Sequence, residues 1–239
     1  PEFTIGKFGI GLDLPLNYRF TGGDGDEFDL REEDWVPDDE NSFLELYLPK
    51  FRYVRYGREG DELYARFGGL PGATLGSGFI MDRYSNELYL PDRRVFGGVL
   101  EMDGALLGVP QFGFETVAAN VAAWDLVGGR LFLRPLVSTS IPILSNVQTG
   151  ATVVVDRDPF YYATKDPMSP YGDEFVDGDI DPVDPPNDDV VVWGVDLQQP
   201  LLQSDVIALT LLGDLAFQDQ RRGGMVGFRG RLVRIVLYG

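Results

Sequence analysis

The chain has 239 residues, a formal net charge of −18, and neither Cys nor His. These counts exclude disulfides, thiolate or imidazole metal ligands, and every Ser-His or Cys-His nucleophile pair. Acidic residues outnumber basic ones, 38 to 20. A nucleic-acid partner is therefore also disfavoured, since a phosphate backbone repels an acidic surface.

Most of the chain alternates apolar and polar residues, which is the two-residue period of a β-strand. Frequent Gly and Pro, 30 and 16 residues, interrupt this alternation and disfavour long helices. Residues 117–122 are the one segment for which the sequence suggests a helical turn. The sequence therefore predicts an all-β protein in a single domain, residues 1–239. We expect strands, in chain order, within residues 9–20, 51–56, 63–67, 75–82, 94–102, 111–116, 130–134, 147–156, 193–198, 209–217 and 226–237, the last containing a tight hairpin near Gly230.

Two acidic stretches, near residues 21–42 and 157–189, lack the alternation, and we expect long loops there. Within the second stretch, four carboxylates occupy positions one, three, five and twelve of a segment that is similar to a Ca²⁺-binding loop: Asp177, Asp179, Asp181 and Asp188. Pro182 and Asp188 stand where such loops need Gly and Glu. The spacing predicts a weak Ca²⁺ site, and the alternative is a solvated acidic loop. No other cofactor is expected.

The alternation fits two architectures. In a soluble β-sandwich the apolar faces fill a core between two sheets, whereas in a membrane β-barrel they face lipid. Small residues on the opposite phase, such as Gly76 and Gly194, favour an antiparallel up-and-down β-barrel of about 10–12 strands. Prolines within strand-like runs, such as Pro135 and Pro200, favour the sandwich, because Pro cannot donate to a ladder. We expect the barrel and keep the sandwich as the alternative.

Charged residues lie on the polar phase of several predicted strands. Both signs are present, so paired charges would fill a narrow interior, since an unpaired buried charge is costly. On a soluble sandwich the same residues would face solvent. No pair of carboxylates stands out as catalytic, and we expect no enzyme activity. The residues that we expect to face the lumen of a barrel are Asp13, Arg66, Glu115, Arg130, Arg134 and Asp196.

Three segments carry a family resemblance: GIGLDLPLNYRF at 9–20, YARFGGLPGATLGSGFIMDRYSN at 64–86 and LVGGRLFLRPL at 126–136. They are similar to segments of uncharacterised outer-membrane β-barrel proteins of bacteria with two membranes. The resemblance implies a barrel and an outer-membrane location, and it brings no catalytic motif. The ending Leu237-Tyr238-Gly239 differs from the terminal aromatic residue of such barrels, as expected of a fragment of a longer barrel.

We therefore expect a bacterial outer-membrane β-barrel that contacts membrane lipid. It would act as a structural or narrow-pore protein with a charged lumen, and its partner would be a small solute or ion. The alternative is a secreted or cell-surface β-sandwich that binds Ca²⁺ or carbohydrate. Neither interpretation involves nucleic acid.

Overall fold

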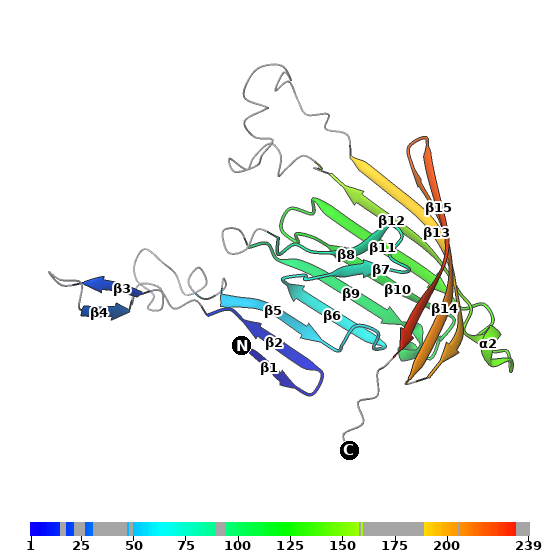
Figure 1. Cartoon of the computed structure of the whole chain (residues 1–239), viewed down its shortest axis with the longest axis horizontal. Coiled ribbons are helices and arrows are strands. Elements are labelled where there is room, and N and C mark those ends of the chain that lie inside the picture. The colour runs from blue at the N-terminus through cyan, green and yellow to red at the C-terminus, as the bar shows by residue number, and fades with distance from the viewer. Residues whose placement is uncertain are drawn as a thin grey trace.

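The computed structural model describes a protein dominated by one large antiparallel sheet (Figure 1). The residues that it describes are 1–14, 18–21, 27–30, 47, 50–88, 94–157, 159, 189–204 and 206–232. The strands of the large sheet are β1 (Glu2–Ile5), β2 (Phe8–Leu12), β5 (Phe51–Tyr56), β6 (Leu63–Gly68), β9 (Gly97–Asp103), β10 (Phe112–Ala118), β11 (Leu126–Leu133), β12 (Gln148–Asp156), β13 (Val190–Gln203), β14 (Ile207–Gln218) and β15 (Arg221–Leu232).

Neighbouring strands of this sheet follow one another along the chain, apart from two inserted pairs. The first pair is β3 (Tyr18–Thr21) with β4 (Glu27–Leu30), and the second is β7 (Ala73–Leu75) with β8 (Met81–Tyr84). The predicted all-β antiparallel architecture is confirmed. The sheet is open, however: β1 and β15 form its two edges and are not paired with each other, so the described residues do not close into a barrel.

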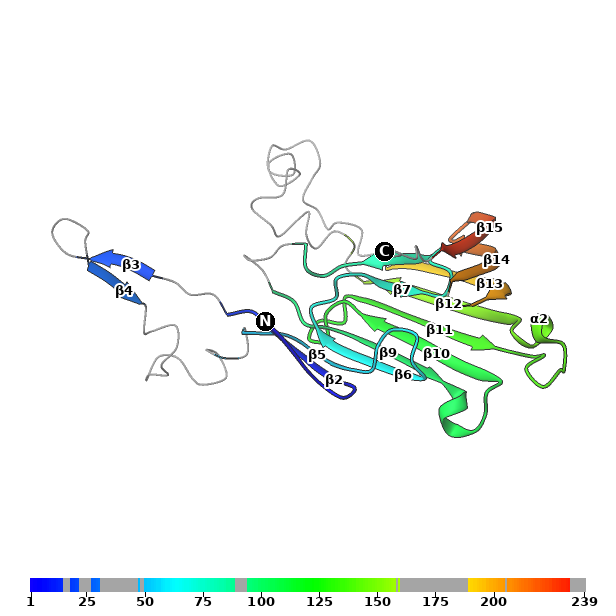
Figure 2. The ribbon, with the colours of Figure 1, turned by 60° about the horizontal axis from the view of Figure 1, so that its bottom comes forward.

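The β7–β8 hairpin lies against one face of the sheet, which we call the inner face (Figure 2). The hairpin reaches far from β6 and β9, which precede and follow it, because Ile80 lies beside Gly194 of β13 and Phe79 beside Gly223 of β15. A segment of this length can contact strands so far apart in the sheet only because the sheet curves around it. The inner face is therefore the concave one.

The opposite, outer face is mostly apolar, with a few neutral polar residues such as Thr116 and Thr149. In the paired registers, Leu131 of β11 lies beside Ala151 of β12, and Ala151 lies beside Val195 of β13. Arg222, at the tip of the β14–β15 hairpin, is the one charged residue at an outer position of these registers. Large apolar side chains that remain exposed on this face include Phe8, Val54, Phe67, Leu100, Leu131, Leu133, Val153, Trp193, Val195, Leu197, Leu215, Val226 and Phe228.

The buried core is small and lies between the hairpin and the inner face. Leu70, which is 1% exposed, is its most buried side chain. Leu75 and Met81 of the hairpin pack in the same cluster as Val117 of β10 and Val154 of β12. The hairpin thus supplies the apolar surface that the inner face would otherwise lack, and it is held there by burial as well as by polar contacts.

Several local predictions are wrong. The expected strand over 9–20 ends at Leu12 in β2, and β3 belongs to a separate two-stranded sheet whose partner, β4, lies within the predicted loop 21–42. Residues 75–82 form the tip of the β7–β8 hairpin instead of a strand of the sheet. The backbone reverses there through Gly76 and Gly78, whose φ angles of 59° and 89° are accessible to Gly at little cost.

Two further predictions near strand ends are also wrong. Val117 and Ala118, placed in a helical turn, continue β10. The hairpin expected near Gly230 is absent because β15 runs unbroken through that residue, and the chain reverses before Arg221 instead. Among the described residues, helical structure includes two four-residue elements, η3 (Gly104–Leu107) and α2 (Pro142–Ser145). None of the described helices is long and apolar enough to span a membrane.

Candidate functional site

The inner face carries a band of charged side chains at the middle of the sheet, which we call the polar band: Glu101, Glu115, Arg130, Asp196 and Asp214. Its members come from five strands, and the register sets them side by side. Glu115 of β10 pairs with Glu101 on one side and with Arg130 of β11 on the other. Asp196 of β13 and Asp214 of β14 are also direct cross-strand partners.

Arg130 is the centre of the polar band. Its side chain is 1% exposed, and its guanidinium donates hydrogen bonds to two carboxylates. Nε and Nη2 donate to Asp196 over 2.9 and 2.7 Å, and Nη1 donates to Glu115 over 2.6 Å. The Asp196 contact is bidentate, which is the strongest geometry for this pair. Every nitrogen of the guanidinium is therefore engaged with a carboxylate.

Two glycines make room for this guanidinium. A Cβ atom at Gly150 of β12 would lie 2.4 Å from Oδ2 of Asp196 and 2.6 Å from Nε of Arg130. A Cβ atom at Gly76 of the hairpin would lie 2.6 Å from the same Nε. The backbone amide of Gly76 also donates to Oε2 of Glu115 over 2.7 Å. The hairpin thus covers the ion pair and completes the hydrogen bonding of Glu115.

The tip of the hairpin is tied to the last two strands by Ser77. Its hydroxyl donates to Oδ1 of Asp214 on β14 and accepts from the amide of Phe79 at 3.2 Å. Arg229 of β15 donates to the backbone oxygen of Ser77. These contacts link residues 137 and 152 positions apart in the chain, so they fix the curvature of the sheet around the hairpin.

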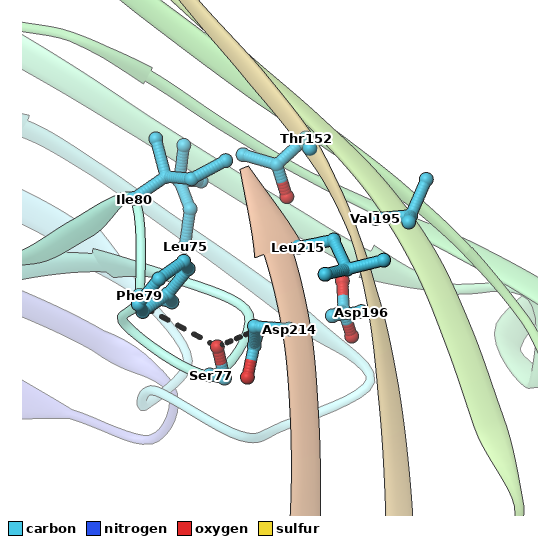
Figure 3. Close-up of a pocket in the computed structure, with 10 residues that line it drawn as sticks. Leu75, Ser77, Phe79, Ile80, Thr152, Val195, Asp196, Asp214 and Leu215 are labelled. Carbon is cyan, nitrogen blue, oxygen red and sulfur yellow. Dashed lines mark hydrogen bonds between the residues drawn. The ribbon is translucent and has the colours of Figure 1, made fainter. Parts of the chain in front are cut away.

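Beside Ser77 the structure contains a cavity of about 10 Å³ (Figure 3). Figure 3 shows Ser77 directed at Asp214, with Asp196 on the neighbouring strand and Thr152 on the strand beyond. The walls include Thr152, Asp196, Asp214 and the apolar side chains of Leu75 and Ile80. Oδ2 of Asp214 is buried and has no hydrogen-bond partner within the described part of the chain.

A second and larger cavity, of about 400 Å³, also borders the hairpin, at Thr74, Gly76 and Asp82. Four carboxylates and one guanidinium line it: those of Glu59, Asp82, Glu101, Glu115 and Arg229. It is more open than the cavity beside Ser77. The interior therefore combines a filled centre with an acidic hollow, and this excess of negative charge favours cations over anions.

Three of the six residues predicted to line a lumen come together, namely Glu115, Arg130 and Asp196. The others lie in separate contacts. Arg134 donates to Asp103 over 2.6 Å. The side chain of Arg66 donates to the carbonyl of Gly69 over 2.6 Å and lies 3.8 Å from the ring centre of Tyr53. Asp13 forms an ion pair with Arg94 and lies outside the strands.

The proposed Ca²⁺ ligands, Asp177, Asp179, Asp181 and Asp188, lie outside the described residues. Their role stays a prediction. In the described ranges there is no group of three or more acidic side chains arranged to hold a metal ion.

Sequence reasoning missed three members of this region as site residues: Glu101, Asp214 and Ser77. Asp214 stood on the polar phase beside Leu215, which placed it on the inner face but gave no sign of its partners. Ser77 gave no signal, because it was expected within a strand and only the folded hairpin brings it to Asp214.

The polar band holds no nucleophile paired with a base. What it can do chemically is hold the positive charge of Arg130 beside carboxylates that are largely buried.

Comparison of the chain with protein-family models, with curated proteins and with solved structures gave no significant match.

Proposed function

We propose that this chain forms the wall of an antiparallel β-barrel in a bacterial outer membrane, with a charged interior closed by the β7–β8 hairpin. Its role is structural, or that of a narrow pore for a small solute or ion, and it is not an enzyme. The observation that carries the proposal is the outer face, where large apolar side chains are exposed and Arg222 at a hairpin tip is the one charged residue at the paired positions of the described strands.

Exposed apolar area of this extent is rare on soluble proteins, whose largest patches cover a few hundred square ångströms. A soluble β-sandwich would cover such a face with a second sheet. In the part of the chain that the structure describes, the other sheets have two strands each, and β7–β8 lies on the inner face. Lipid is the environment that matches an uncovered apolar surface.

Strand length supports the same proposal for the last four strands of the sheet, β12–β15. A strand that crosses a membrane at a tilt needs about 9–11 residues. β12 has 9 residues, β13 has 14, and β14 and β15 have 12 each. The strands from β1 to β6 have 4–6 residues, so the membrane-crossing role rests on β12–β15. The resemblance of three sequence segments to outer-membrane barrels points the same way.

The inner face supports a closed interior rather than an open channel. Arg130 and Asp196 are buried beneath the hairpin, and the cavity beside them has the volume of one water molecule. Outer-membrane β-barrels differ in whether the lumen is an open channel or is filled by loops or a plug. The hairpin fills that position here, while the acidic cavity at its side leaves space for a small cation.

A matched pair of glycines tests the orientation. Gly213 lies at the middle of β14 on the outer face, and Gly227 lies at the middle of β15 on the inner face. Neither has a neighbouring atom within 4 Å of where a Cβ would be, so both positions accept a side chain without a clash. An Arg facing lipid at mid-depth costs roughly 2–4 kcal/mol, whereas one facing a lumen costs little.

We therefore expect Gly213→Arg to lower the stability of the protein refolded in lipid vesicles by about 2–4 kcal/mol, and Gly227→Arg to change it by less than about 1 kcal/mol. Denaturant titration of vesicle-bound protein measures both values. Gly213→Ala and Gly227→Ala control for loss of Gly itself. Two outcomes would overturn the membrane proposal. One is an equal change in stability for Gly213→Arg and Gly227→Arg, and the other is a wild-type chain that folds in water and does not bind vesicles.

A further inference from the structure

We propose that the cavity beside Ser77 binds one small monovalent cation of about the size of Na⁺, with the carboxylate of Asp214 as its principal ligand. Thr152 and Asp196 line the same cavity and complete the oxygen-rich side of the site (Figure 3). This inference goes beyond the proposed membrane role and does not depend on it, because it rests on the interior of the sheet alone.

The first observation is an unsatisfied ligand atom. Asp214 is 7% exposed, and Ser77 donates to its Oδ1 only. Oδ2 is buried and has no hydrogen-bond partner within the described residues, yet the residue lines the cavity. Buried polar atoms are almost always satisfied in folded proteins. An unpartnered carboxylate oxygen at a cavity wall therefore indicates a bound species in that cavity.

The second observation is charge. Asp196 and Asp214 are direct cross-strand partners on the inner face, an arrangement that brings two Cβ atoms to about 5 Å and is unfavourable for like charges. Arg130 cannot neutralise both, because its three nitrogens are already engaged with Asp196 and Glu115. Arg229, which donates to the backbone of Ser77, lies near enough to Asp214 to act on its carboxylate. Arg130 and Arg229 therefore face the three carboxylates of Glu115, Asp196 and Asp214, which leaves an excess of one negative charge. A bound cation at Asp214 supplies compensation that a water molecule cannot supply.

The third observation is size. The cavity measures about 10 Å³, close to the smallest volume that holds one water-sized species. A divalent ion such as Ca²⁺ needs six to eight oxygen ligands, and the described residues contain no group of three or more acidic side chains placed to hold a metal ion of any kind. A single small monovalent ion fits both the volume and the limited set of oxygens. Choline is too large to enter.

The test compares NaCl with choline chloride at equal ionic strength, using the full chain refolded in uncharged detergent. A ligand that binds only the folded state multiplies the folding constant by one plus the ratio of its concentration to its dissociation constant. We expect the thermal midpoint in NaCl to exceed that in choline chloride. Above the dissociation constant, each tenfold rise in Na⁺ should raise the folding constant about tenfold.

Three variants locate the effect. Asp214→Asn and Thr152→Val should each weaken or abolish the difference between NaCl and choline chloride. Asp82→Asn should retain it, because Asp82 lies on the same hairpin but its side chain is 51% exposed and does not line the cavity. Thr152→Val removes the hydroxyl but keeps the shape of the side chain. This variant therefore still tests the site if Asp214→Asn does not fold.

Two outcomes overturn the proposal. Equal midpoints in NaCl and choline chloride for the wild-type chain would show that Asp214 holds a proton or contacts a water molecule instead. A sodium effect that persists in both Asp214→Asn and Thr152→Val would place the ion elsewhere. Because the assay uses detergent and no bilayer, a negative result leaves the membrane proposal to its own test.

Discussion

Replacing Arg130 by Met removes the one positive charge at the centre of the polar band while retaining an unbranched side chain. The Arg130 side chain is 1% exposed, and the side chains of Asp196 and Glu115 are 5% and 19% exposed. The substitution deletes three hydrogen bonds and leaves two largely buried carboxylates without a cation. Removing one partner of a buried ion pair costs roughly 3–5 kcal/mol, a large share of a total stability of about 5–15 kcal/mol.

Urea unfolding in detergent, followed by tryptophan fluorescence, measures this loss. Arg130→Lys should recover only part of it, because an ammonium group cannot form the bidentate contact with Asp196. The combined variant Arg130→Met, Asp196→Asn, Glu115→Gln should be more stable than Arg130→Met alone, since neutral side chains remove the stranded charges.

Arg83→Met is the matched control. Its side chain is 84% exposed, and surface substitutions of this kind change stability by less than about 0.5 kcal/mol. If Arg130→Met lies within about 1 kcal/mol of the wild-type chain, the carboxylates are not confined in a dry interior, and the reasoning from burial fails.

Two further predictions concern the hairpin and the outer face. Leu75→Ala should destabilise the protein by about 2–5 kcal/mol, because Leu75 is 4% exposed in the core beneath the hairpin. Leu107→Ala, at a side chain that is 62% exposed, should have a small effect in the same urea titration, and similar losses would indicate that the hairpin is not packed. Trp193 is 50% exposed on the outer face and stacks on Phe217. In a variant with Trp35 and Trp124 replaced by Phe, we expect brominated lipids to quench the fluorescence of Trp193. Fluorescence that bromine leaves unchanged would contradict contact between Trp193 and lipid.

Alternation in the sequence was enough to place most side chains on the correct face of the large sheet. For β11 to β14 the predicted polar phase, including Arg130, Asp196 and Asp214, is the inner face of the structure. This succeeds because a period of two is a local property of the chain and does not depend on which strands pair. The same locality explains why the sequence did not show whether the sheet closes.

Contacts across strands could not be predicted in this way. Arg130 and Asp196 are 66 residues apart in the chain, and their meeting depends on the register of β11, β12 and β13. A slip by one residue in any of these pairings would turn one of the two side chains to the opposite face. Alternation names the residues that face inward, and only the register decides which of them meet.

The hairpin at 75–82 was misassigned because its apolar side chains also recur at every second position. Leu75 and Met81 fill a core in the structure, and the same spacing would place them on one face of a sheet strand. Gly76 and Gly78, both with positive φ, were interpreted as small residues of a polar face. Two glycines two positions apart fit a turn equally well, and the distinction requires knowledge of what the segment packs against.

The edge strand β15 bears on whether the sheet can lie in a membrane as it stands. Its outer side chains Val226, Phe228 and Leu232 are 83%, 68% and 76% exposed, while Arg229 and Arg231 occupy inner positions. Soluble proteins protect an open edge with charges or by covering it, because unpaired backbone groups beside apolar side chains promote aggregation. On β15 the charges lie on the inner side, apart from Arg222 at the hairpin tip, and they do not protect the outer side. In lipid the unpaired backbone groups of such an edge would be still more costly. The membrane proposal therefore requires that β15 acquire a strand partner, and a chain that inserts with this edge unpaired would contradict it.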